Sequence, residues 1–304
     1  METKPIEAVS IVGGAGFMGA QIGLHCASHG YTVWFVDISE EVLERASHSH
    51  EQELETRVER QQITADEKKV ILKRIHYTRD VKVGASRADL VIEAVPERLE
   101  TKREVFAQLD EICPSHTILA TNSSSIRISH IEDATHRPDR VLNAHFYGSI
   151  SRVTMVELMR GTVTSDETIE RVSRFVHSIG LTPLLVRKES TGFIFNRVWR
   201  AIKKECLCVV DEGVASHEDV DRAWMIFFDL PIGPFGMMDA RGLDVMRDIE
   251  MVYYHESGDE SDAPPQILLD KIERGELGVK TGKGFYTYPD PAFAAPSWLR
   301  SDNK

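Results

Sequence analysis

Short apolar runs alternate with longer segments of mixed apolar and charged residues as far as residue 189. Runs of about four to eight residues that are rich in Val, Ile, Leu and aromatic residues are typical of buried strands, whereas apolar positions at helical spacing predict amphipathic helices. Predicted strands cover residues 8–12, 31–36, 88–95, 117–121, 141–145, 153–158 and 182–186, and predicted helices cover 17–29, 40–61, 65–74, 97–112 and 165–179. This alternation predicts βαβ units in a mostly parallel, doubly wound α/β sheet.

The strand pattern ends near residue 190, and further helices are predicted at 193–214, 218–228 and 243–255. A chain of 304 residues fits two domains at roughly 150 residues each. We therefore predict an α/β domain over residues 1–189, with a helical hairpin inserted at about 40–74, and an all-α domain over residues 190–304.

Composition and charge narrow the class of protein. Hydrophobic residues make up 42% of the chain and charged residues 28%, which is ordinary for a globular protein. The net charge of −12 argues against a nucleic-acid-binding protein, which usually carries a basic surface. The amino terminus lacks the apolar core of a signal peptide, no apolar run approaches the ~18–20 residues that span a bilayer, and the four cysteines form no Cys-x-x-Cys pair. We expect a cytoplasmic protein that binds no metal, membrane or nucleic acid.

A glycine-rich turn joins the first predicted strand to the first predicted helix. Residues 14–19 read Gly-Ala-Gly-Phe-Met-Gly, the G-x-G-x-x-G pattern of dinucleotide-binding βαβ units. We expect Gly14 to allow the tight turn, Gly16 to let the backbone approach a pyrophosphate, and Gly19 to let the helix pack closely on the strand. A Rossmann-type nucleotide-binding fold is therefore predicted, and a plain glycine turn is the alternative.

Asp37 ends the second predicted strand, at the distance from the glycine turn at which such units place an acidic residue. A carboxylate there accepts hydrogen bonds from ribose hydroxyls and repels a 2′-phosphate, so NAD is favoured over NADP. A flavin would usually need further nucleotide contacts, which the sequence does not show. The predicted NAD-binding residues of this region are Gly14, Gly16, Phe17, Met18, Gly19 and Asp37.

His145 is the candidate base for the oxidation of an alcohol. It ends the apolar strand 141–145, and ligands of open α/β sheets bind beyond the carboxyl ends of strands. An imidazole suits proton transfer near neutral pH. Glu157 lies near the end of the next predicted strand, where it could orient the imidazole and stabilise its charged form. The alternative is a histidine that is merely hydrogen-bonded.

A run of hydroxyl side chains follows another predicted strand. Residues 122–125 read Asn-Ser-Ser-Ser after the strand 117–121. Their hydroxyls could bind a substrate oxygen, or they could cap the helical pattern that follows, and the two roles are compatible.

The chain resembles the short, stand-alone 3-hydroxyacyl-CoA dehydrogenases over nearly its whole length. The resemblance rests on several motifs in one order, which together are far more specific than any one of them. The motifs are Val-Gly-Gly-Ala-Gly-Phe-Met-Gly (12–19), Val-Ile-Glu-Ala-Val-Pro-Glu (91–97), Thr-Asn-Ser-Ser-Ser-Ile (121–126), His-Phe-Tyr (145–147), Met-Val-Glu-Leu (155–158), Thr-Gly-Phe-Ile-Phe-Asn-Arg (191–197), Pro-Ile-Gly-Pro-Phe (231–235) and Lys-Thr-Gly-Lys-Gly-Phe-Tyr (280–286).

The resemblance implies a role for each candidate residue. His145 would remove the proton of the 3-hydroxyl, Glu157 would hold its imidazole, and Ser124 would bind the 3-oxygen. Asn196 would position the substrate near the nicotinamide. Hydride would pass between C3 of an L-3-hydroxyacyl-CoA and the nicotinamide, a reaction of fatty acid metabolism, and the helical domain would form a homodimer. The residues implied on the cofactor side are Glu93, Glu97 and Asn122.

Three departures from the family pattern concern the substrate. Gly148 and Ser149 stand where the family usually has Asn-Pro, and Thr191 stands where it has Pro. The hairpin has fewer lysines than is usual, although residues 60–79 carry six basic and two acidic side chains, a net of +4. That excess suits a phosphate-rich ligand such as CoA, and a solvated helix face is the alternative.

Two other functions stay open. One is a dehydrogenase of the same superfamily that acts on a free 3-hydroxy acid, which the altered loop and the missing lysines favour slightly. The other is a catalytically silent NAD-binding protein, against which the joint presence of His145, Glu157, Ser124 and Asn196 argues.

Overall fold

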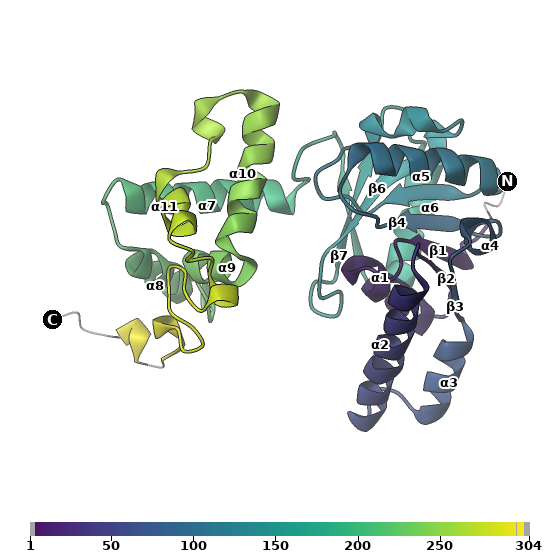
Figure 1. Cartoon of the computed structure of the whole chain (residues 1–304), viewed down its shortest axis with the longest axis horizontal. Coiled ribbons are helices and arrows are strands. Elements are labelled where there is room, and N and C mark those ends of the chain that lie inside the picture. The colour runs from purple at the N-terminus through teal and green to yellow at the C-terminus, as the bar shows by residue number, and fades with distance from the viewer. Residues whose placement is uncertain (1–3, 296, 301–304) are drawn as a thin grey trace. The chain divides into compact units, whose positions relative to one another are not determined.

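A computed structural model describes residues 4–295 and 297–300 (Figure 1). The chain forms two compact units, of which the first ends at Ile194 and the second begins at Phe195. Residues 1–3, on which part of the amino-terminal prediction rests, and residues 296 and 301–304 of the second predicted domain lie outside the described residues.

The first unit is built on an eight-stranded sheet, which confirms the predicted α/β class. The strand order is β3-β2-β1-β4-β5-β6-β7-β8, and β1 to β6 run parallel. β7 is antiparallel to β6, and β8 is parallel to β7. The strands are β1 (Ala8–Val12), β2 (Thr32–Val36), β3 (Ile75–Thr78), β4 (Leu90–Glu93), β5 (Ile118–Thr121), β6 (Val141–Phe146), β7 (Met155–Arg160) and β8 (Thr182–Val186).

Helices cover both faces of this sheet, as a doubly wound fold requires. The central strand β4 shows the division, because Leu90 and Ile92 pack with the helices of one face and Val91 with those of the other. One face carries α1 (Phe17–Ser28), α2 (Glu40–Glu59), α3 (Ala65–Lys73) and α6 (Asp166–Ser178), and the other carries α4 (Val81–Ala85) and α5 (Leu99–Ile112). In Figure 1 the predicted hairpin, α2 and α3, extends beyond the sheet.

The strand β3 and the α-helix α4 of the first unit were not predicted. β3 is an edge strand of four residues in which only Ile75 is buried, so it leaves almost no apolar pattern. α4 has five residues and begins where the Asp80 side chain accepts hydrogen bonds from the N–H groups of Lys82 and Val83. β4 and β5 are equally short but fully buried, so the missing apolar run, and not length, hides β3. α4 is too short for a helical period to reveal it.

The second unit is helical, which confirms the predicted all-α class. Its helices are α7 (Phe195–Asp211), α8 (His217–Phe228), α9 (Pro234–Arg241), α10 (Leu243–Ser257) and α11 (Gln266–Glu273), of which α9 and α11 were not predicted. The buried Asp239 carboxylate accepts hydrogen bonds from the N–H groups of Phe285 (2.9 Å) and Tyr286 (2.8 Å). A Cβ at Gly284 would collide with Asp239, so the glycine of the Gly-Phe-Tyr motif lets this segment close onto α9.

Candidate active site

The glycine turn after β1 is tied to the end of β2. The N–H groups of Gly13 and Gly14 both donate to the Val36 carbonyl, at 2.9 and 3.0 Å. A Cβ at Gly14 would lie 2.8 Å from the Ile11 carbonyl oxygen, so the close approach within this turn needs glycine at this position, as predicted. The turn also depends on Gly13, which has a φ of 77° and was not predicted to have this role.

The other two glycines of the motif have different surroundings. A Cβ at Gly19 would lie 2.4 Å from the Gly13 carbonyl oxygen, so only glycine lets α1 approach the turn. A Cβ at Gly16 would lie 3.3 Å from that same oxygen, which is a tight contact but not a collision, and Gly16 is exposed. α1 begins here with neither a capping side chain nor an acidic residue in its first turn, where Phe17 is exposed and Met18 half-buried. These features fit the pyrophosphate of a dinucleotide.

Asp37 lies against the same turn. Its Oδ2 accepts a hydrogen bond from the Ala15 N–H at 3.1 Å, and its Oδ1 accepts one from the Ile38 N–H at 2.8 Å. The carboxylate is therefore held at the carboxyl edge of β1 and β2, beside the glycine turn. Its contact with a ribose stays a prediction.

His145 and Glu157 face each other across β6 and β7. They are directly opposed in the antiparallel register, both are buried, and Nδ1 of His145 lies 3.2 Å from Oε2 of Glu157. Because a carboxylate only accepts hydrogen bonds, we assign the proton to Nδ1, which leaves Nε2 free to accept a proton from a substrate. The predicted position of Glu157 near the end of its strand is wrong, since it is the third residue of β7. The reversed direction of β7 brings it to the same sheet edge.

The Glu157 carboxylate is also held by a backbone N–H and by a tyrosine hydroxyl. The Ile194 N–H donates to Oε1 at 2.9 Å, and the Tyr147 hydroxyl donates to Oε2 at 2.7 Å. Gly192 and Phe193 have left-handed φ angles of 74° and 55°, which turn the chain back toward the sheet before α7. The Phe193 ring packs on the His145 ring at a centroid distance of 4.8 Å. Sequence reasoning noted the Thr-Gly-Phe motif but missed these contacts.

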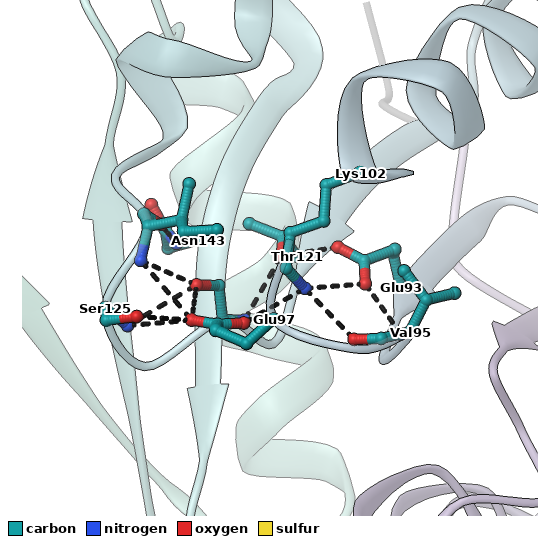
Figure 2. Close-up of polar contacts among 9 residues, drawn as sticks. Glu93, Val95, Glu97, Lys102, Thr121, Ser125 and Asn143 are labelled. Atoms are coloured by element: carbon teal, nitrogen blue, oxygen red, sulfur yellow. Dashed lines mark hydrogen bonds and ion pairs between the residues drawn. The ribbon is translucent and has the colours of Figure 1, made fainter. Parts of the chain in front are cut away.

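Glu97 organises the loop that follows β5 (Figure 2). Its Oε1 accepts hydrogen bonds from the Ser125 N–H (3.1 Å), the Ser125 hydroxyl (2.7 Å) and the Ser123 hydroxyl. Burial alone would raise the pKa of Glu97, but the charge of Lys102 and these hydrogen bonds outweigh it and hold the pKa below its usual value. Ser124, between the two bound serines, is exposed at the same edge.

The serines do not cap the next helical turn, although the Ser123 hydroxyl makes a cap-like hydrogen bond within the loop by accepting from the Ile126 N–H at 2.8 Å. The next helical turn, Ile128–His130, begins after Arg127 and has no side-chain cap. Ser123 and Ser125 instead bind Glu97, which leaves Ser124 as the hydroxyl of the run available to a ligand.

A buried ion pair holds Glu97 and thereby supports this loop (Figure 2). Lys102 Nζ lies 2.8 Å from Glu93 Oε1 and 3.2 Å from Glu97 Oε2. Glu93 also accepts hydrogen bonds from the Thr121 hydroxyl (2.6 Å) and the Val95 N–H (2.7 Å). Sequence reasoning missed Lys102. Its place on the apolar face of α5, one turn before a buried phenylalanine, was the signal that could have found it.

The last two predicted residues lie in different units. Asn122 links β5 to the histidine strand, because its Oδ1 accepts a hydrogen bond from the Phe146 N–H at 2.8 Å. Asn196 is the second residue of α7, in the second unit, and is half-buried. The cofactor roles of Asn122 and Glu97 and the substrate role of Asn196 stay predictions.

Within the described part of the chain, no group of three or more His, Cys, Asp or Glu side chains is arranged to hold a metal ion. None of the helices described there has the length and apolar character needed to cross a membrane.

Fold and site together define a class of protein. An open parallel sheet, a glycine turn with an acid after the second strand, and a histidine–carboxylate pair at the same edge are the parts of a nicotinamide-dependent dehydrogenase. The family model for the 3-hydroxyacyl-CoA dehydrogenase NAD-binding domain matches residues 8–190, and the model for the C-terminal domain matches residues 192–288. The chain belongs to the 3-hydroxyacyl-CoA dehydrogenase family, and NAD is its cofactor.

Individual relatives agree with this assignment. A probable 3-hydroxybutyryl-CoA dehydrogenase of Bacillus subtilis is 36% identical over 290 residues, which cover 95% of this chain and 99% of that protein. A 3-hydroxyadipyl-CoA dehydrogenase of Escherichia coli is 37% identical over 285 residues, 93% of this chain but 59% of that longer protein. The crystal structure of (S)-3-hydroxybutyryl-CoA dehydrogenase from Ralstonia eutropha matches with a TM-score of 0.87 at 34% identity, covering 94% of this chain and 100% of that one.

Proposed function

We propose that the protein interconverts L-3-hydroxyacyl-CoA and 3-ketoacyl-CoA thioesters, with His145 as the base. The observation that carries this proposal is the buried His145–Glu157 pair, 3.2 Å apart, at the sheet edge where the glycine turn also lies. The family and the named relatives support the substrate class, since their names specify 3-hydroxybutyryl-CoA and 3-hydroxyadipyl-CoA.

Each residue has a definite task in this reaction. Nε2 of His145 accepts the proton of the 3-hydroxyl during oxidation and returns it during reduction. Glu157 keeps the imidazole in the required tautomer and stabilises the imidazolium. Ser124 donates to the 3-oxygen, and Asn196 positions the substrate. The glycine turn and Asp37 would hold NAD, which would supply the hydride acceptor for C3.

The test is NADH oxidation with acetoacetyl-CoA. His145→Gln removes the proton-transfer group, so we expect kcat to fall by about 10²–10⁴-fold. His48→Gln is the matched control, because His48 is an exposed histidine on α2. Equal turnover by His145→Gln and the parent enzyme would refute the base assignment, and it would favour a catalytically silent NAD-binding protein if both are inactive.

A dehydrogenase of a free 3-hydroxy acid is the second candidate. Ser149 has a φ of 61°, which proline cannot adopt, so the loop after the base takes a course that the family's usual Asn-Pro would not allow. Two lysines of the basic segment, Lys68 and Lys69, form ion pairs with Glu55 and Asp66, which reduces the charge left for CoA phosphates. A higher kcat/KM for acetoacetate than for acetoacetyl-CoA would favour this candidate.

We also propose a homodimer formed through the second unit. α8 exposes three consecutive large apolar side chains, Ile226, Phe227 and Phe228, and Phe227 is 81% exposed. Apolar patches of this kind usually mark an interface. Sedimentation should give twice the mass of the chain, and a monomer at micromolar concentration would contradict the proposal.

A cytoplasmic location is supported by the four cysteines, none of which forms a disulfide.

A further inference from the structure

Tyr147 contacts both members of the His145–Glu157 pair. Its hydroxyl donates to Glu157 Oε2 at 2.7 Å, the same oxygen that lies 3.2 Å from Nδ1 of His145. Its ring lies 4.4 Å from the His145 ring, centroid to centroid. Glu157 is opposite His145 on the neighbouring strand, and Tyr147 is the first residue after β6, two positions beyond His145.

We propose that Tyr147 is a positioning residue that sets how strongly Glu157 stabilises the charged imidazole. This proposal rests on the proposed role of His145 as the base. A phenylalanine would fill the same space, but it could not donate to the carboxylate. The tyrosine hydroxyl therefore adds one property to the pair, a second donor on the oxygen that faces the histidine.

The Tyr147 hydroxyl and the His145 imidazole both contact the same oxygen of Glu157, and they share its negative charge. An oxygen that accepts a short hydrogen bond from a hydroxyl has less negative charge available for a second donor. Glu157 therefore stabilises the imidazolium less than an otherwise equal carboxylate would. The Ile194 N–H binds the other oxygen and fixes the carboxylate orientation.

The surroundings of His145 leave few other groups to account for such an effect. Among the residues that the structure describes, the titratable side chains that contact the imidazole are Glu157 on β7 and Tyr147 just after β6. Phe193, from the segment after β8, contacts the ring but carries no charge. Asn122, after β5, binds the adjacent Phe146 backbone and is likewise uncharged.

The test is the pH dependence of kcat/KM for oxidation of L-3-hydroxybutyryl-CoA by the full chain. Tyr147→Phe should move the midpoint of the acid limb upward by about 0.5–1 pH unit, because the imidazolium is then better stabilised. In a Glu157→Gln background the same substitution should cause no shift. Tyr254→Phe is the matched control, since it removes a tyrosine–carboxylate hydrogen bond of 2.8 Å at an exposed site of the second unit.

A second variant keeps the hydroxyl and its packing. Replacement of Tyr147 by 3-fluorotyrosine makes the phenol a stronger donor, and it should move the acid limb downward. This variant decides the question even if Tyr147→Phe fails to fold. An acid limb that stays in place in both Tyr147 variants would overturn the role of Tyr147 while leaving the base intact. Equal activity of His145→Gln and the parent would instead refute the proposed function itself.

Discussion

The substitution Lys102→Met tests how the loop that carries Ser124 is supported. Lys102 is 1% exposed and Glu93 is fully buried, with the charged atoms 2.8 Å apart. At an effective dielectric constant of about 20, two unit charges at this distance attract by about 6 kcal/mol before desolvation is counted. Methionine keeps the apolar stem but leaves the Glu93 carboxylate buried without its cation. Loss of one partner of a buried pair typically costs about 3–5 kcal/mol, and we expect the free energy of unfolding to fall by that amount.

Urea unfolding followed by far-UV circular dichroism measures the effect. The double variant Glu93→Gln/Lys102→Met should recover most of the loss, because a neutral amide in place of the carboxylate removes the unpaired charge. Lys69→Met is the control, since Lys69 forms an exposed pair with Asp66 that should contribute less than about 1 kcal/mol. A loss below about 1 kcal/mol for Lys102→Met, or no recovery in the double variant, would refute the reasoning.

Three further predictions concern the cofactor turn and the hairpin. Asp37→Ala should weaken NADH binding and raise the relative affinity for NADPH in fluorescence titrations, and an unchanged preference would contradict the ribose contact. Gly16→Ala should weaken NADH binding at nearly unchanged stability. Gly19→Ala should weaken NADH binding and also lower the melting temperature, because only the Cβ at position 19 collides with the turn. Equal melting temperatures for the two variants would contradict this difference. Burial lowers the pKa of His50 to about 4. Above about pH 6.5 the imidazole is neutral in the folded and the unfolded protein, and the free energy of unfolding has its full value. As the pH falls toward 4, only the unfolded protein takes up the proton, so the free energy of unfolding decreases. Urea titrations should show the parent losing up to about 3 kcal/mol more than His50→Gln across this range, and equal losses would contradict the assignment.

The strongly periodic parts of the fold could be predicted from the sequence. The strands from Ala8 to Val36 and the helices that follow them have long apolar patterns and clear capping signals, such as Thr64, which forms a capping box with Glu67. β3 and α9 could not be predicted, because β3 is a short edge strand and α9 depends on a tertiary contact. The N–H groups of Phe235 and Gly236, in the first turn of α9, donate to the buried Asp221 carboxylate, a partner that no local pattern reveals.

The site was predictable where chemistry depends on a residue type at a strand end. His145, Asp37 and the glycines follow that rule, and the structure places them at one sheet edge. The supporting groups were not predictable, because they contact residues that are not their neighbours in the sequence. Lys102 joins Glu93 across nine residues, and Tyr147 reads as another aromatic residue until its hydroxyl is seen beside Glu157.

The reversal of β7 makes the position of the proposed base, His145, independent of the loops around it. In the parallel part of the sheet, side chains that meet at the carboxyl edge come from the loops after each strand, as Asn122 and Ser124 do. In the antiparallel pair, the end of β6 faces the beginning of β7, so backbone hydrogen bonds of the sheet position both His145 and Glu157. The chain between the two strands can then change its course without moving either partner. This explains how a left-handed Ser149 can reshape the neighbouring loop while His145 and Glu157 stay hydrogen-bonded to each other.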